Sequence, residues 1–474
     1  MNPERVERWQ PGIPLSGAAR ALGMLKRWDE AIDCRRRAID AFDADEDRRG
    51  KAVELDLLGD ALRAAGRSEE ALQAYQDAID VGMTPDRATG WSPAVPLSDA
   101  ADVLAEMGRW DEAIDCRRRA ADAFEADGDR RRTAIALDLL GDGLVEGGRV
   151  EEAVDAYLKS HETGMNPERV EDWEPGIPLR DAARALAVLK RWDEAADCRR
   201  RAADAFRGDG NRRACTVELE YWGHALQESG RLEEALAAFL SSHETGMNPE
   251  RVGKWEPGIP LAGAAEALEQ LERWDEAADF RRRAALAFHA DGDRLGGARE
   301  FEFLGDNLVE AGRLDEAIDA YLKSHETGMK PEPVAHWDSA RPLLEAARTL
   351  EHLGRDEDAG RMWQAAVDAG LLGLGQAGDG NAESTLVCAS LGLGRSLAAR
   401  DGNIAALEAM EAGREPALLI ERLEQPQPWL LEPCADWWTL QSTLLAAIGD
   451  RTEAEAAATR AAAIRARIGE SDES

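Results

Sequence analysis

The sequence predicts an all-α protein built as a solenoid of helical hairpins, and three observations predict it. Variants of the segment MNPERVxxWxPGIPL begin at Met1, Met83, Met165, Met247 and Met329, so the chain repeats with a period of 82 residues. Apolar residues recur at helical spacing between these segments. Glycines such as Gly66 interrupt them where a turn needs a left-handed residue. A long period with helical patterning and short breakers is typical of stacked helix-turn-helix units.

Each 82-residue repeat contains two helical hairpins. In the second hairpin of the first repeat, Leu55, Leu58 and Leu62 recur at i, i+3 and i+7, and a second apolar stripe follows the turn. This segment, AVELDLLGDALRAAGRSEEALQAYQDAI, closely resembles the tetratricopeptide repeat (TPR). The residues at the family's spacing are the packing Gly59, the turn Gly66, the small Ala71 and Ala78, and the aromatic Tyr75.

The first hairpin of each repeat resembles the family less closely. Ala19 replaces the packing glycine, and Arg35 stands where the family prefers an aromatic residue. Trp28, one turn upstream, is expected to fill that volume. The same arrangement recurs in every RWDEA segment, at Trp110, Trp192 and Trp274.

The resemblance implies a right-handed α-α superhelix of about eleven helix-turn-helix units. We expect a regular TPR array over residues 1–339, with double repeats starting at 1, 83, 165 and 247. Residues 340–474 are expected to hold degenerate repeats and a C-terminal cap, because an end unit has nothing stacked on its outer face. The chain opens in the middle of a repeat boundary, so it is either an excerpt of a longer array or a chain with an exposed start.

Composition narrows the class of partner. The chain has 93 acidic and 58 basic residues, a net charge of −35, which argues against nucleic acid or an anionic membrane surface as the partner. No apolar run approaches the roughly 20 residues that span a bilayer. Cys34, Cys116 and Cys198 occupy equivalent positions one repeat apart, too far for disulfides. Reduced thiols and the lack of a signal peptide favour a cytoplasmic location.

No motif points to catalysis, a cofactor or a metal. Residues 373–378 fit GxGxxG, but a helical run leads into them rather than the strand that a dinucleotide site needs, so they are interpreted as a linker. The cysteines lack zinc spacing. The dominant residues repeat, whereas an active site needs one unrepeated constellation, so we expect no enzyme.

Two further repeated features have competing interpretations. The arginine triplets that begin at Arg35, Arg117, Arg199 and Arg281 follow an aspartate at i, i+4, which indicates a solvated, salt-bridged helix face. The loop tryptophans either plug the joints between repeats or form a surface ladder that captures a partner, and the plug is favoured. These are Trp9, Trp91, Trp173, Trp255 and Trp337.

The candidate binding residues form an acidic column. The resemblance implies that the first helix of each hairpin lines a concave groove, where a partner peptide lies. The groove positions of the second hairpins hold Asp56 and Asp60, Asp138 and Asp142, Glu220 and His224, and Glu302 and Asp306. Like charges at i, i+4 destabilise a helix, and one interpretation of these pairs is a trough for a Lys/Arg-rich segment. The alternative is pairing with groove arginines such as Arg20, Arg184 and Arg348. His224 would make binding in the third repeat depend on pH.

The predicted function is a cytoplasmic, non-enzymatic scaffold or adaptor that binds a basic protein or peptide segment in this groove. One alternative is a sensor module of a larger signalling or transcription-regulating system. Another is an acidic decoy that blocks a basic protein.

Overall fold

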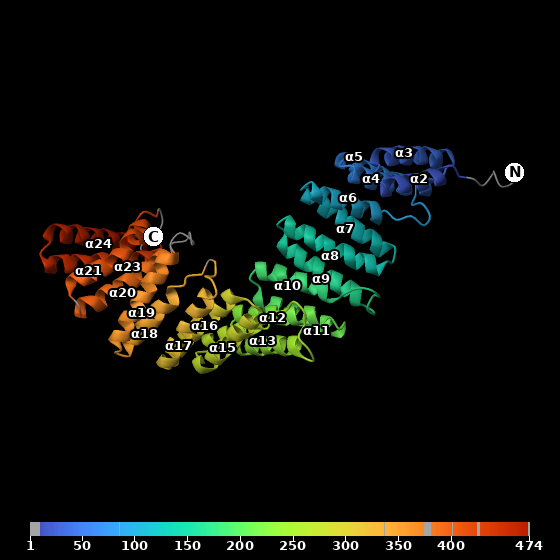
Figure 1. The fold of residues 1–474 in the computed structure, drawn as a ribbon. Helices are drawn as coiled ribbons and strands as arrows, with labels where there is room; N and C mark the ends of the chain where they lie inside the picture. Colours follow the sequence, from blue (N-terminus) through green and yellow to red (C-terminus); the bar gives the residue numbers. More distant parts are fainter. Residues whose placement is uncertain are drawn as a thin grey trace. The chain divides into compact units, whose positions relative to one another are not determined.

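The computed structural model describes residues 10–84, 86–335, 337–373, 381–400, 402–423 and 427–472. Within these ranges every regular element is a helix (Figure 1). The chain divides into two compact units, Met1–Arg231 and Leu232–Ser474, which are described one at a time.

Among its described residues, the first unit holds five complete hairpins and the first helix of a sixth, arranged in sequence order. Its helices are α2 (Gly12–Met24), α3 (Trp28–Ala44), α4 (Arg48–Ala64), α5 (Ser68–Met83), α6 (Ala94–Glu106), α7 (Trp110–Ala126), α8 (Arg130–Glu146), α9 (Val150–Met165), α10 (Gly176–Val188), α11 (Trp192–Gly208) and α12 (Arg212–Glu228). Each helix packs on the next one along the chain, and the first helices α2, α4 and α6 also contact one another.

The second unit continues the same pattern and then becomes irregular. Its helices are α13 (Leu232–Met247), α14 (Gly258–Gln270), α15 (Trp274–Ala290), α16 (Arg294–Glu310), α17 (Leu314–Met329), α18 (Arg341–His352), α19 (Asp356–Gly373), α20 (Asn381–Arg400), α21 (Asn403–Met410), the 3-10 turn η1 (Glu411–Gly413), α22 (Arg414–Glu421), α23 (Pro428–Ile448) and α24 (Arg451–Asp472). The partner of α20 is broken into α21, η1 and α22, all of which contact it.

Glycines and helix caps explain where the helices of a hairpin pack closely, turn and begin. A Cβ on Gly59 would lie 2.4 Å from the Tyr75 ring, so only glycine lets the two helices of this hairpin approach so closely. Gly66 has φ +75°, as the predicted turn requires. Asp47 caps α4 by accepting a hydrogen bond from the backbone N–H of Gly50 at 2.8 Å, and equivalent residues cap α8, α12 and α16.

The long loops between repeats bury their tryptophans. Trp91, Trp173 and Trp255 are buried, and each ring lies against a glycine near the end of the preceding helix. These glycines are Gly82, Gly164 and Gly246. Arg169 donates to the backbone carbonyl of Trp173 at 2.8 Å and pairs with Asp209 in the next hairpin. The rings therefore act as plugs at the joints, as predicted; Trp9 lies outside the described residues.

The predicted all-α array of hairpins is confirmed. In α19, Ala359 and Trp363 are buried. That residues 340–474 form degenerate repeats and a cap stays a prediction. The boundary at residue 339 between regular and degenerate repeats stays a prediction, since the compact units divide at a different place. Across the described ranges, no helix is both long enough and apolar enough to cross a membrane.

Candidate functional site

The first two predicted acids belong to a cluster of carboxylates between neighbouring first helices. Asp56 and Asp60 on α4 lie near Asp99 on α6, and we call these three residues the first acidic cluster. Asp60 accepts a hydrogen bond from the Tyr75 hydroxyl at 2.9 Å. The Oδ1 atom of Asp56 is buried and has no hydrogen-bond partner. Burial, then the charges of Asp99 and Asp60, raise the pKa of Asp56 to about 8.

The raised pKa of Asp56 makes stability depend on pH. The folded state holds this proton up to about pH 8, whereas the unfolded chain releases it near 4, so stability is lost as the pH rises between these values. Asp56→Asn should raise the free energy of unfolding at pH 8.5 by about 1–2 kcal/mol and change it little at pH 5. Urea titrations at both pH values measure this, with the exposed Asp115→Asn as control. An equal effect of Asp56→Asn at both pH values would contradict it.

A second acidic cluster repeats the first one 82 residues further on. It consists of Asp138 and Asp142 on α8 and Asp181 on α10. Asp142 accepts a hydrogen bond from the Tyr157 hydroxyl at 2.7 Å. Burial, then Asp142 and Asp181, raise the pKa of Asp138 to about 7, and Arg180 opposes this increase. A cation of the facing helix therefore lies beside the second cluster, whereas the arginine near Asp60 and Asp99 in the first cluster is Arg63 of α4 itself.

The second unit contains a third acidic cluster, made of Glu302, Asp306 and Glu345. Glu302 is buried and forms an ion pair with Arg341 at 2.8 Å, and Asp306 accepts from the Tyr321 hydroxyl at 2.7 Å. Burial raises the pKa of Glu302 to about 7 against the opposing charge of Arg341. In the remaining repeat, Glu220 and His224 are half-buried. There His224 stands where the other repeats have the aspartate that accepts from tyrosine, and Phe239 stands where they have that tyrosine. The acceptor and its hydroxyl donor are therefore replaced together.

Two of the arginines that were expected as alternative partners pair with carboxylates of the second and third acidic clusters. Arg184 lies 3.5 Å from Asp181, and Arg348 lies 2.9 Å from Glu345, each on its own helix. The cross-helix partner of Glu302 is Arg341, which the sequence did not single out. On α6, Ser98 and Asp102 occupy the positions that Arg180 and Arg184 hold on α10. The first cluster thus faces no arginine from α6.

Exposed apolar side chains accompany the acids and were missed by the sequence analysis. One residue after Asp138, Glu220 and Glu302 stand Leu139, Tyr221 and Phe303, which are 39%, 48% and 39% exposed. Their recurrence every 82 residues was a signal that could have identified them. Leu57, after Asp56, is half-buried, and Val53 one turn earlier is exposed. The first helices therefore carry apolar side chains beside carboxylates.

The prediction of solvated arginine triplets is wrong for the first arginine of three triplets. Arg35, Arg199 and Arg281 are buried where the family places an aromatic residue, and each reaches a glutamate 19 residues later on the next helix. Arg35 thus occupies the volume assigned to Trp28, which is half-buried. The third arginines fit the prediction better, since Arg37 lies 3.8 Å from Asp33.

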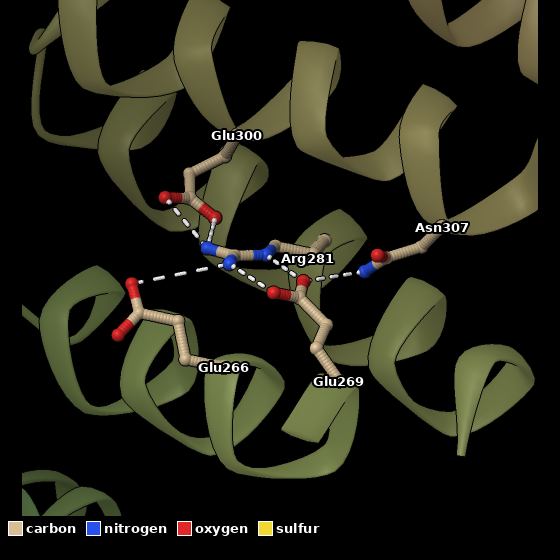
Figure 2. A network of polar contacts seen from close by, with 5 residues as sticks. All are labelled: Glu266, Glu269, Arg281, Glu300 and Asn307. Atoms are coloured by element: carbon tan, nitrogen blue, oxygen red, sulfur yellow. Dashed lines mark hydrogen bonds and ion pairs between the residues drawn. The ribbon is translucent and has the colours of Figure 1, made fainter. Parts of the chain in front are cut away.

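Figure 2 shows the most extensive of these buried networks, around Arg281. Its guanidinium donates to both oxygens of Glu269, at 2.8 and 3.0 Å, and to both oxygens of Glu300, at 3.0 and 3.3 Å. Glu266 lies 3.9 Å away, and the Asn307 side chain donates to Glu269 at 2.7 Å. The network joins α14, α15 and α16, and its donors are taken up by carboxylates of the chain itself, so its role is structural.

In the described part of the chain, no group of His, Cys, Asp and Glu is arranged to hold a metal ion. The six cysteines are free thiols. Most of the GxGxxG segment, from residue 374 onward, lies outside the described residues.

Comparisons with known proteins agree with this architecture. A family model described as "Tetratricopeptide repeat" matches residues 13–82 and 93–163. No curated protein matches the chain.

Several solved structures resemble parts of the chain at low sequence identity. A TPR repeat-containing protein from Cytophaga hutchinsonii is 12% identical, with a TM-score of 0.41, over 60% of this chain and 95% of that one. Kinesin light chain TPR-like repeats from Podospora anserina are 15% identical, with a TM-score of 0.35, over 42% and 95%. A signal transduction ATPase with a TPR sensor from Pyrococcus horikoshii is 12% identical, with a TM-score of 0.40, over 72% of this chain and 51% of that one.

The family match covers the first two 82-residue repeats, and the third and fourth repeats reproduce their sequence at the same period. Residues 13–82 and 93–163 are therefore tetratricopeptide repeats by this match, and the repeats that follow them share their sequence pattern.

Proposed function

We propose that this protein is a non-enzymatic scaffold or adaptor that binds a Lys/Arg-rich protein segment along its first helices. Tetratricopeptide repeats generally mediate protein–protein interaction and scaffolding. The finer proposal concerns which chemistry the partner carries and where it binds. The predicted acids Asp56, Asp60, Asp138, Asp142, Glu220, His224, Glu302 and Asp306 are its candidate contacts.

The observation that carries the proposal is that buried carboxylate oxygens of the first two acidic clusters lack hydrogen-bond partners. In the third cluster a guanidinium of the chain itself pairs with Glu302 at 2.8 Å, and in the second cluster Arg180 lies close to Asp138. The first cluster has equivalent carboxylates but a serine and an aspartate on the facing helix. Buried oxygens of Asp56 and of the equivalent Asp138 both lack a hydrogen-bond partner, and they mark places where a donor is missing. An arginine or lysine from a partner would supply that donor.

The exposed apolar side chains refine the partner's chemistry. Val53 on α4 and Val95 at the start of α6 are exposed on the two helices that carry the first cluster. Apolar contacts contribute affinity, whereas charge pairs mainly contribute specificity and association rate. The partner segment is therefore expected to combine basic residues with apolar ones rather than to be purely basic.

The test uses a fluorescein-labelled dodecapeptide of alternating arginine and leucine as the probe. We expect the double variant Asp60→Asn/Asp99→Asn to weaken its binding about tenfold, because two carboxylates of the first cluster are neutralised. Asn at position 60 retains an oxygen that accepts the Tyr75 hydrogen bond, so the fold should persist. Fluorescence anisotropy at two salt concentrations measures the affinity.

The matched control removes the same charge elsewhere. Asp115 and Asp197 are exposed on α7 and α11, and Asp115→Asn/Asp197→Asn should change the affinity less than twofold. Equal weakening by both double variants would mean that only net charge matters, which contradicts the proposed location. Equal affinity for an alternating glutamate–leucine peptide would contradict the proposed partner chemistry.

A further inference from the structure

A row of apolar residues crosses the first helices of the first unit. The residues are β-branched, stand in the first half of each helix and recur at alternating intervals of 42 and 40 residues. We call them the apolar row: Val53 on α4, Val95 on α6, Ile135 on α8, Ile177 on α10 and Val217 on α12. The first three are 38%, 37% and 38% exposed, and the last two are half-buried. Helices of the chain pack on both sides of α4, α6 and α8, so the row stays exposed after the repeats have stacked.

Folding does not require apolar side chains at these positions. β-Branched residues are restricted in a helix and lower its propensity slightly. Two equivalent positions of the second unit hold exposed arginines, Arg299 on α16 and Arg341 on α18, and the helices form there as well. Contiguous apolar side chains that remain on a surface are typical of a binding site. A bound partner therefore explains the row better than packing within the chain.

The apolar row lies next to the acids of the clusters. On α4, Val53 and Asp56 are related as i and i+3, so they share a helix face. The third cluster shows that the row also neighbours the acids of the preceding first helix. There Arg341 occupies the position that Val95 holds three repeats earlier. Its guanidinium lies 2.8 Å from Glu302, which occupies the position of Asp56. The first unit thus places an apolar side chain beside a carboxylate where the second unit places an arginine.

The spacing of the row limits the conformation of a bound segment. Axes of packed helices lie about 8–10 Å apart, so neighbouring residues of the row are separated by about the same distance. A polyproline II segment advances about 9 Å in three residues. A β-strand returns a side chain to the same side after about 7 Å. An α-helix presents one residue per heptad at about 10.5 Å. Of the three, only the polyproline II period falls within the spacing of the row.

We propose that the apolar row and the acids beside it bind an extended segment of a partner protein with a three-residue repeat, in which an apolar residue is followed by arginine or lysine. Three residues complete one turn of a polyproline II helix, so its side chains form three lines. One line contacts the apolar row, the next faces Asp56, Asp99 and Asp138, and the third faces solvent. This inference rests on the proposed function, because it specifies the conformation and spacing of the same basic segment.

The first test compares two fluorescein-labelled dodecapeptides of equal composition. One repeats Leu-Arg-Pro four times, because proline at every third position favours the polyproline II conformation and prevents an α-helix. The other contains the same residues in an order that places no two leucines three residues apart. We expect the ordered peptide to bind the full chain at least tenfold more tightly in fluorescence anisotropy, because only its leucines match the row.

The second test removes the apolar character of the row and keeps its β-branched side chains. The variant Val53→Thr/Val95→Thr/Ile135→Thr changes exposed residues, so it should retain the circular dichroism and urea midpoint of the parent. We expect it to bind the Leu-Arg-Pro peptide about tenfold more weakly, because three apolar contacts are lost. The salt dependence of binding should equal that of the parent, because no charge has changed.

The matched control removes three apolar side chains of similar exposure from second helices. Leu240, Leu286 and Leu322, on α13, α15 and α17, are 37%, 50% and 36% exposed. Replacing all three by threonine should change the affinity for the Leu-Arg-Pro peptide less than twofold. Equal weakening by both triple variants would overturn the proposed location.

Results with the peptides can also overturn the proposal. One such result is equal binding of the ordered and reordered peptides. Another is the lack of saturable binding of the ordered peptide up to about 1 mM. A third is tighter binding of a helical peptide of four heptads, each with one leucine followed by arginine, because the segment is then bound as a helix.

The charge variant Asp60→Asn/Asp99→Asn separates this inference from the proposed function. If it weakens binding of the Leu-Arg-Pro peptide and the threonine variant does not, the acidic site stands and the apolar row is overturned. If only the threonine variant weakens binding, the acids do not contact the segment, and both the proposed function and this inference fail. We expect both variants to weaken binding, and only the charge variant to reduce its salt dependence.

Discussion

Replacing Arg281 by methionine is expected to destabilise the second unit by about 3–5 kcal/mol. The guanidinium is 3% exposed and pairs with both Glu269 and Glu300 (Figure 2). Methionine fills a similar volume but leaves two carboxylates without their cation in a site where water reaches them poorly. The loss should appear in urea titrations and as faster hydrogen exchange in α14, α15 and α16.

The chain provides its own control for this effect. Arg117 occupies the same repeat position as Arg281, but Ala136 stands where the glutamate would be, and the Arg117 guanidinium reaches only the Leu139 carbonyl and Asp102, the latter at 3.6 Å. Arg117→Met should therefore destabilise the first unit much less. Replacing Arg281, Glu269 and Glu300 together by apolar residues should recover most of the loss. Equal losses for Arg281→Met and Arg117→Met would show that packing volume, not charge pairing, holds this position.

The hairpin architecture was predictable because its determinants are local. Gly66 turns the chain, Gly59 admits Tyr75, and the apolar stripes follow the helical period within a few residues of one another. Because the sequence repeats every 82 residues, the prediction for one hairpin could then be applied to the equivalent hairpins of the other repeats. The plugging role of the loop tryptophans followed from the same argument, although the glycines that receive the rings were overlooked.

The burial of the arginines was not predictable from one helix. Asp33 and Arg37 form the expected surface pair. Arg35 is instead buried because it pairs with Glu54, which lies on the next helix. The sequence does contain a signal, because glutamate recurs 19 residues after the arginine in three repeats and is replaced by Ala136 in the fourth. A search for residue pairs that recur at the repeat period would have revealed it.

The sequence predicted that the acids of the column share a helix face, but it did not predict their burial or their neighbouring charges. The i, i+4 spacing placed Asp56 and Asp60 on one helix face, and in the structure the charge of Asp60 acts on Asp56. Whether each carboxylate is paired depends on the facing helix, where Arg341 meets Glu302 and no arginine of α6 meets Asp56. Burial also raises the pKa of these carboxyls, so the column carries less charge at neutral pH than the sequence implies.

Removing the tryptophan plug at one joint should have an effect of similar size to the loss of Arg281. Trp173 is buried between the second and third repeats, against Gly164 at the end of α9. Trp173→Ala is expected to destabilise the first unit by about 3–5 kcal/mol, because the ring's contacts are lost and the cavity cannot collapse fully. Urea titration followed by circular dichroism measures the loss. A loss no larger than that of Trp28→Ala, at a half-buried ring, would contradict the plug.

Gly164 tests the same joint from its other side. A Cβ on Gly164 would lie 2.4 Å from the Trp173 ring, so Gly164→Ala should destabilise by about 1–3 kcal/mol although alanine is the better helix former. A Cβ on Gly208, in the last turn of α11, would meet no atom within 4 Å, and Gly208→Ala should stabilise slightly. If the two substitutions change stability in opposite directions, the loss at Gly164 comes from the clash with the Trp173 ring and not from helix propensity. Combining Gly164→Ala with Trp173→Leu should be less destabilising than the sum of the two, because the smaller side chain makes room for the methyl group.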